Sequence, residues 1–233
     1  MNVIFPSRAR GTLLATSLAC LCLVPATDAV AEDLASNLGE SPSGNHSPLF
    51  GQWYASPFVT DARQWSLTSV TFTLDPGQFP EPQVAFARIH EDDGTGKPGA
   101  LLAELVNPGG LNFGPPGDYV FAAPPGVMLE ADTQYLVVLG SQVPPPGTAD
   151  QRAFWVYTDS VAWTGPGTLP GGTVRSFDQG ASWGSPLTER HSIFAVQAEP
   201  IETVPLLGPG ALGGLAALLL GSGSLALARS QRS

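Results

Sequence analysis

The chain has 233 residues, a formal net charge of −10 and two cysteines, Cys20 and Cys22. Residues 32–204 carry 19 acidic and six basic residues, so the formal charge of this stretch is −13. A charge of this sign repels phosphate backbones and disfavours nucleic acid as a partner. Both cysteines fall in an N-terminal apolar run. Removal of that run excludes a disulfide framework, a thiol nucleophile and a thiolate metal site.

Residues 1–31 are predicted to be a signal peptide. Two arginines precede Gly11–Val24, an apolar run of the length expected in such a peptide. Small residues fit signal peptidase, with cleavage expected after Ala31 or, as the second choice, after Ala29. Acylation of Cys20 in a lipoprotein signal is disfavoured, because the leucine before it stands one place off.

Residues 32–200 are predicted to form a single all-β outer domain. Apolar and polar residues alternate in Thr68–Leu74, which is the pattern of a half-buried strand. Most of the chain's 27 glycines and 23 prolines fall in this domain and mark the turns between such strands, and no stretch of the domain shows helical periodicity. Many short strands separated by turns predict a β-sandwich or jelly roll. Strands are expected at Thr68–Leu74, Gln83–Ile89, Tyr119–Phe121, Tyr135–Leu139, Ala153–Tyr157 and Ile193–Gln197.

The densest polar cluster is His90–Gly94, which includes Asp92 and Asp93. Ca²⁺ prefers clustered carboxylate oxygens, so these two aspartates are a candidate calcium site. The cluster lacks the spacing of an EF-hand loop, and a hairpin turn rich in turn-forming residues explains it as well. We therefore favour a turn without a bound cofactor. His46 and His191 stand too isolated to predict a zinc site.

Residues 176–183 match the Asp-box pattern Ser-x-Asp-x-Gly-x-x-Trp. In such a box the aspartate accepts hydrogen bonds from the turn backbone, the glycine takes a positive φ, and the tryptophan packs beneath the hairpin. Propellers such as sialidases carry several copies, whereas this chain has one and no internal repeat. We expect a structural hairpin made by Ser176, Asp178, Gly180 and Trp183.

The same stretch contains Gly180–Gly184, which matches the hydrolase elbow Gly-x-Ser-x-Gly. That chemistry needs a buried strand before the serine and a helix after it. Polar residues precede Ser182, and Pro186 prevents a helix beyond it. We therefore predict no catalytic residue here.

Aromatic residues give the outer domain an alternative role. Aromatics in a β-sandwich mostly belong to the core, but an exposed set can stack on sugar rings. A lectin-like carbohydrate-binding module is therefore the alternative function, with extracellular polysaccharide as its partner. The residues considered for this role are Trp53, Trp65, Trp155, Trp163, Trp183, Tyr54 and Tyr157.

The C-terminal tail has three parts. Residues 201–205 form a linker with a proline, and residues 206–228 are 23 uncharged residues, long enough for a transmembrane helix. The last part, 229–233, carries two arginines and is predicted to be cytoplasmic. Such a tail resembles the bacterial C-terminal sorting signals of the IPTL and PEP type, which implies an exosortase-like membrane protease as partner. The corresponding sorting motif is Val204, Pro205, Leu206 and Leu207.

Three segments follow one another in the outer domain: Gly94–Gly99, Leu129–Leu139 and Ser182–Trp183. With the Leu-x-Ala-x-Thr-x-Tyr run as its most specific piece, the stretch 37–196 resembles the choice-of-anchor R domain, a β-rich module of bacterial surface proteins. That family has no assigned activity, so the resemblance implies an architecture only. These features together predict a non-enzymatic exported protein of the cell envelope or surface. It would be anchored in the membrane or released outside the cell.

Overall fold

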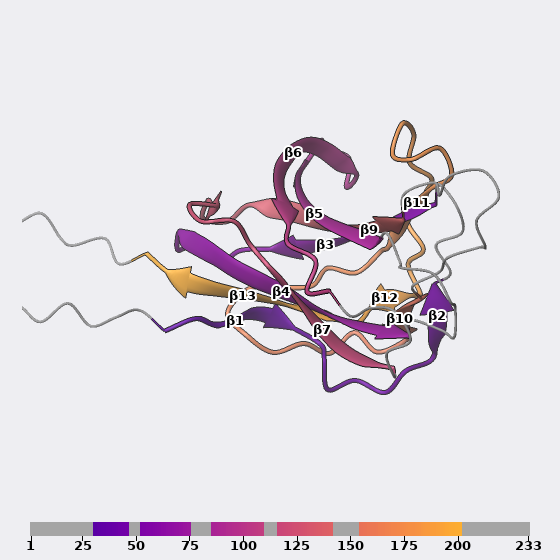
Figure 1. The fold of residues 1–233 in the computed structure, drawn as a ribbon, viewed down its shortest axis with the longest axis horizontal. Coiled ribbons are helices and arrows are strands. Elements are labelled where there is room, and N and C mark those ends of the chain that lie inside the picture. The colour runs from indigo at the N-terminus through magenta and orange to yellow at the C-terminus, as the bar shows by residue number, and fades with distance from the viewer. Residues whose placement is uncertain (1–29, 47–51, 76–84, 110–115, 142–153, 202–233) are drawn as a thin grey trace, which may run out of the picture.

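The computed structural model describes residues 30–46, 52–75, 85–109, 116–141 and 154–201. In these residues the protein is all-β, without a helix, and its strands form two antiparallel sheets (Figure 1). The all-β prediction is therefore confirmed. No helix within these ranges is long and apolar enough to cross a membrane. The predicted membrane helix, the sorting motif and nearly all of the predicted signal peptide lie outside the described residues.

The larger sheet is built around its longest strand, β4 (Trp65–Asp75). Its other strands are β1 (Glu32–Ser36), β2 (Gly44–His46), β7 (Gly117–Ala122), β8 (Met128–Leu129), β10 (Phe154–Thr158), β12 (His191–Ser192) and β13 (Phe194–Pro200). Strand β4 pairs with β13 along most of its length, with β8 at its start, with β7 through its second half and with β10 at its end. Strand β1 pairs with β13, and both β2 and β12 pair with β10.

The smaller sheet has five strands. In spatial order they are β11 (Val174–Ser176), β3 (Trp53–Val59), β9 (Gln134–Ser141), β5 (Ala85–Asp92) and β6 (Pro98–Leu105). The central strand β9 is a continuous apolar run because both of its faces are buried. Val137 and Leu139 belong to the main core, whereas Leu136 and Val138 belong to a second cluster on the other face.

One hydrophobic core takes side chains from both sheets. Along β4 the alternation of the sequence places Val70, Phe72 and Leu74 in this core. Phe72 packs edge-to-face against Phe121, with ring centroids 5.1 Å apart, and against Trp155 at 5.2 Å. Burial of large aromatic rings dominates the stability of a core of this size. The largest fully buried side chains include Trp65, Trp155, Phe58, Phe72, Phe121 and Phe194.

Three strands of the smaller sheet, β3, β6 and β11, are absent from the expected set. Pro57 interrupts the apolar pattern of β3, and proline is unfavourable inside a sheet because it cannot donate to the ladder. In the structure β11 pairs with β3 only as far as Ala55, whereas β9 continues to pair through Pro57 and beyond. The proline therefore lies where β3 has lost its β11 neighbour, which is why the strand tolerates it.

A short segment, residues 164–168, joins the edges of the two sheets. Thr164 exchanges backbone hydrogen bonds with Ser36 of β1, and Thr168 does so with Val59 of β3. Between them, Gly167 N donates to Leu34 O at 2.7 Å. This segment therefore covers otherwise unpaired backbone groups of both sheets on one side of the domain.

We expect Gly167→Ala to lower the free energy of unfolding by roughly 1–3 kcal/mol, the range for overpacking of a tight site. An added Cβ would lie 2.6 Å from Val59 O and 2.9 Å from Leu34 O. Both oxygens belong to backbone held in hydrogen bonds, so neither can move aside cheaply. Thermal unfolding of the purified chain measures the effect. Gly39→Ala is the matched control, because nothing lies within 4 Å of the Cβ it would add.

Candidate functional site

Strand β4 runs between two opposite ends of the domain, and different strands lie at each end. At its start, Trp65 pairs with Pro200 of β13, and β13 lies beside β1, which begins at Glu32 (Figure 1). At its other end, Asp75 pairs with Phe154 of β10, the strand that also holds β2 and β12. We call these the terminal end and the far end. The 11 residues of β4 separate them by roughly 35 Å, at about 3.4 Å per residue.

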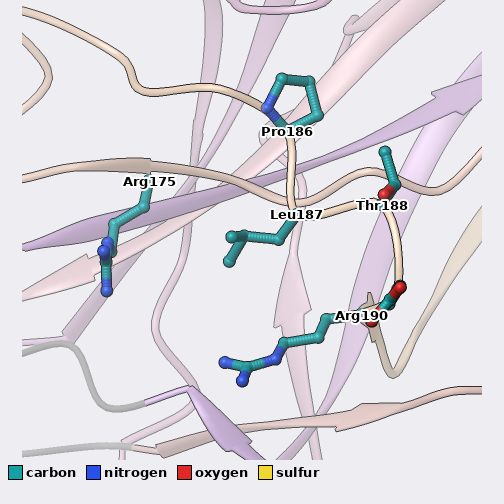
Figure 2. A pocket seen from close by; sticks show the side chains of 6 residues that line it. Arg175, Pro186, Leu187, Thr188 and Arg190 are labelled. Carbon is teal, nitrogen blue, oxygen red and sulfur yellow. The ribbon is translucent and has the colours of Figure 1, made fainter.

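Two adjoining hollows lie at the far end, where β11, β10 and the segment before β12 meet. The first has a volume of about 400 Å³ (Figure 2) and the second of about 620 Å³, and they share Thr188, Glu189 and Arg190. The first is also lined by Arg175, Pro186 and Leu187, and the second by Tyr157, Asp159, Val161 and His191. We call the two hollows together the arginine pocket.

Each arginine of the pocket is held against an aromatic ring. The Cζ atom of Arg175 lies 4.1 Å from the ring centroid of Phe177, and that of Arg190 lies 5.0 Å from the ring centroid of Tyr157. Figure 2 shows both side chains extending to the same side of the Pro186–Arg190 segment. A guanidinium stacked on a ring keeps its N–H donors in the plane, where they remain available to a ligand.

The two pocket arginines also lack carboxylate partners within the described part of the chain. The ion pairs found there belong to Arg63, with Glu32 and Asp61, and to Arg88, with Glu104. The pocket therefore holds two arginines that are free of ion pairs among the described residues, with the carboxylates of Glu189 and Asp159 elsewhere in its lining.

A buried hydroxyl chain fixes the backbone of the pocket. Thr173 is fully buried, and its Oγ1 donates to Arg190 O at 3.1 Å. With its one hydrogen used in this way, Oγ1 accepts from Ser56 Oγ at 2.9 Å and Ser192 Oγ at 3.0 Å. In addition, Leu187 N donates to Thr173 O at 2.8 Å. Thr173 thus links the two sheets and positions the segment that carries Arg190.

We expect Thr173→Val to lower the free energy of unfolding by about 1–3 kcal/mol. Valine keeps the shape of threonine but leaves two buried hydroxyls and a carbonyl without their partner, and each unsatisfied buried group is costly. Thr173→Ser is the conservative comparison, because it retains the hydroxyl and removes only a methyl group. Urea unfolding of both variants checks the result. A valine variant more stable than the serine variant would contradict the hydroxyl chain.

His46 lies beneath the pocket, and the charges of the two pocket arginines affect its pKa. Its side chain is only 2% exposed and stacks between the rings of Tyr54 and Tyr157, each with a centroid distance of 4.7 Å. Burial, together with the smaller effects of the Arg190 and Arg175 charges, lowers the pKa of His46 to about 4. The imidazole is therefore neutral at physiological pH.

The Asp-box residues form a closed loop directly after Arg175. Ser176 Oγ donates to Asp178 Oδ1 and accepts from Gly180 N, both at 2.8 Å. Asp178 accepts from Ser182 N at 2.8 Å and from Ser182 Oγ at 2.6 Å, and these bonds hold the pKa of its carboxyl below the usual range. The loop closes where Gly184 N donates to Arg175 O at 2.8 Å, which fixes the backbone of that arginine.

The other two members of the box face the smaller sheet. Gly180 has a φ of 84°, and a Cβ there would lie 2.5 Å from the ring of Trp53. Trp183 packs against the cluster on the outer face of that sheet, which includes Leu136 and Val138. The loop therefore covers part of this face while it holds Arg175 in place.

The aspartates of the candidate calcium site lie at the terminal end. Asp92 Oδ1 accepts from Gly96 N at 2.8 Å and from Gly94 N at 3.1 Å, while its Oδ2 accepts from Gln134 Nε2 at 2.9 Å. Asp93 Oδ1 accepts from Thr95 N at 2.8 Å, and bonds from Thr95 hold the pKa of its carboxyl below the usual range. Both carboxylates thus shape the turn, and calcium binding there stays a prediction.

A hollow of about 410 Å³ adjoins this turn and is rich in carboxylates. Within the described residues, no three His, Cys, Asp or Glu side chains come close enough together to hold a metal ion. Its acidic lining residues are Glu91, Asp92, Glu130 and Asp132.

The aromatic residues considered for sugar stacking separate into two groups. Trp65, Trp155 and Tyr54 are buried in the main core. Trp163 is 43% exposed, and Tyr157 lines the arginine pocket. Trp53 and Trp183 pack against the outer face of the smaller sheet.

Sequence reasoning missed both pocket arginines. Arg175 directly precedes the Asp box, but no motif marks either arginine as a ligand-binding residue. The strand pairing that brings Tyr157 and His46 together joins segments distant in sequence. The one available signal of the arginines is scarcity, because residues 32–204 hold only six basic residues.

No protein-family model matches this chain, and no curated protein matches its sequence. The resemblance to the choice-of-anchor R domain therefore stays a prediction.

Proposed function

We propose that this protein is a non-enzymatic surface protein, exported by its signal peptide and displayed outside the cytoplasmic membrane by its C-terminal segment. The all-β domain is the displayed part and belongs to the β-sandwich or jelly-roll class. The C-terminal apolar span anchors it until an exosortase-like protease processes the tail at Val204–Leu207. The sequence of the two chain ends supports this proposal, since each has the composition of a targeting segment.

The observation that carries the proposal is the position of the two ends of the domain. Strands β1 and β13 pair antiparallel, with Glu32 opposite Ala198. The expected cleavage site and the link to the membrane segment therefore lie at the same end. A domain tethered in this way points its far end, with the arginine pocket, away from the membrane. This arrangement suits a module that meets ligands outside the cell.

Fractionation of the native cells, combined with mass spectrometry of the full protein, tests this function. We expect a mature N-terminus at Glu32, in a form that external protease degrades in intact cells or spheroplasts. A chain that retains its first residues and stays in the cytosolic fraction would overturn the proposal. Loss of everything after about Val204 supports sorting, whereas an intact Ser233 in the membrane fraction supports a plain anchor and removes the sorting step.

A lectin-like role is the second candidate for the displayed domain. The arginine pocket favours it, because it combines charged donors, carboxylate acceptors and the ring of Tyr157 in an open hollow. Binding sites for sugars use this mixture of polar groups and an aromatic surface. A screen of the purified full chain against immobilised glycans tests this role, and the absence of any binding would exclude it.

A further inference from the structure

The arginine pocket brings together two of the few basic residues of an acidic domain. Residues 32–204 carry a formal charge of −13, yet Arg175 and Arg190 line the same hollow. Within the described residues neither arginine forms an ion pair, whereas Arg63 and Arg88 do. An arginine that only improves solubility does not need to lie in the same hollow as a second arginine. Two guanidinium groups without ion-pair partners in one hollow can together hold an anion.

The two guanidinium groups act on the same region of space. Both lower the pKa of the buried His46, which stacks on Tyr157 below the pocket. His46 thus stays neutral and adds no third positive charge. Its Nε2 has no hydrogen-bond partner among the described residues. The positive charges that line the pocket at neutral pH are therefore those of the two arginines.

The arginines are also preorganised for binding. Phe177 and Tyr157 support the two guanidinium planes, so less side-chain entropy is lost when a ligand binds. The backbone of Arg175 is fixed by Gly184 N, and that of Arg190 by the hydroxyl of the buried Thr173. Such support from neighbouring groups is typical of a preorganised binding site, because it holds the donors in position before the ligand arrives.

The remaining polar groups indicate what else the ligand carries. Asp159 and Glu189 line the pocket beside the arginines, together with the hydroxyl of Thr188. These carboxylates repel a multiply charged anion such as a polyphosphate more strongly than a singly charged one, and they accept hydrogen bonds from hydroxyl groups. Tyr157 and Val161 supply an apolar wall for a ring. A ligand that satisfies all of these groups is an anion that also bears several hydroxyls.

We propose that the arginine pocket binds the carboxylate of an acidic sugar, such as a uronic-acid unit of an extracellular polysaccharide. Arg175 and Arg190 hold the carboxylate with their N–H donors. Thr188, Asp159 and Glu189 bind the sugar hydroxyls, and the ring lies toward Tyr157. This inference rests on the proposed display of the domain, which brings the far end into contact with external polymers.

The experiment uses the full chain, purified from membranes in mild detergent, and tri-galacturonic acid as the probe. Isothermal titration calorimetry compares it with the uncharged trisaccharide of galactose and with sodium phosphate. We expect tri-galacturonic acid to bind, and its affinity to fall as salt rises. Equal affinity for the uncharged sugar would overturn the role of the carboxylate. Phosphate binding with the same dependence on arginine would overturn the acidic-sugar assignment in favour of a simple anion site.

Variants identify the residues responsible. Arg175→Gln and Arg190→Gln should each weaken binding of tri-galacturonic acid about tenfold or more, as expected for loss of a charged hydrogen bond. Arg63→Gln is the matched control, because Arg63 also lies over an aromatic ring, Trp65, but at the terminal end. Its affinity should stay within about twofold of the original. Unchanged binding by both pocket variants would overturn the site.

A conservative variant and a test of folding separate the role of the guanidinium group from a loss of structure. Arg190→Lys retains the charge and loses the planar fork, so its affinity should fall between those of the original and Arg190→Gln. A thermal melt shows that each variant is folded, which separates lost binding from lost structure. Because binding is measured on purified protein, a cell-surface protein that fails to bind removes this inference and leaves the display function intact. A cytosolic location would overturn the display function, and with it the external polysaccharide as ligand, even if the purified protein bound the probe.

Discussion

Replacing Trp155 with alanine should lower the free energy of unfolding by about 3–5 kcal/mol, the range for removing a large buried aromatic side chain. Trp155 is fully buried and packs edge-to-face against Phe72 and Phe194, with centroid distances of 5.2 and 5.8 Å. Its Nε1 donates to Ile193 O at 2.9 Å. Alanine would leave a cavity and remove one of the two donors to Ile193 O, which would keep only Thr73 N at 3.2 Å. Urea unfolding followed by circular dichroism measures the loss.

Two comparisons separate these contributions. Trp155→Phe keeps most of the ring contacts and loses the hydrogen bond, so we expect a smaller loss of roughly 1–3 kcal/mol. Trp163→Ala is the matched control, because Trp163 is 43% exposed and its removal should change stability by less than about 1 kcal/mol. If Trp155→Ala proved as stable as Trp163→Ala, the position of Trp155 in the core would be wrong.

The second large effect is a loss of stability in mild acid, caused by His46. Its pKa falls from 6.5 in the unfolded chain to about 4 in the folded protein, chiefly because it is buried and also because Arg190 and Arg175 lie near it. The unfolded state therefore binds the proton more tightly. The contribution of neutral His46 is fully present above pH 6.5 and is lost as the pH falls toward 4. The loss amounts to about 3 kcal/mol.

Urea unfolding at a series of pH values checks this prediction. His46→Asn removes the titration, so the curve of stability against pH should flatten between pH 6.5 and 4, whatever its absolute height. Burial also lowers the pKa of His90, which adds a contribution of the same sign, and a double variant should flatten the curve further. The lowered carboxyl pKa values of Asp93 and Asp178 act only below their usual value of 3.8. An unchanged slope in His46→Asn would contradict the burial of this histidine.

The strands that could be predicted are those with a regular pattern. Thr68–Leu74 alternates in the sequence and lies inside β4, and the expected strand at Tyr135–Leu139 lies inside β9. Period-two alternation and short apolar runs are properties of neighbouring residues, so the sequence alone displays them. Strand β3 was missed because Pro57 breaks its pattern. The reason it is tolerated, the early end of β11, is a property of the sheet.

The candidate site also has one part that the sequence predicts and one part that it does not. Ser176, Asp178 and Ser182 contact one another within one loop, so a short motif carries the information for that loop. Arg175 and Arg190 come from separate segments of the chain and share a hollow because β11 joins one sheet and β12 the other. No local pattern encodes that approach.

The sequence by itself determined the all-β class, the strongly acidic charge and several of the strands. These properties depend on composition and on residues close together in the chain, where alternation, turn formers and short hydrogen bonds act. Only the tertiary structure decided that β1 and β13 lie together and that His46 lies beneath Tyr157 and the two pocket arginines. These contacts depend on the register of strands distant in sequence, which is selected by the packing of the whole core.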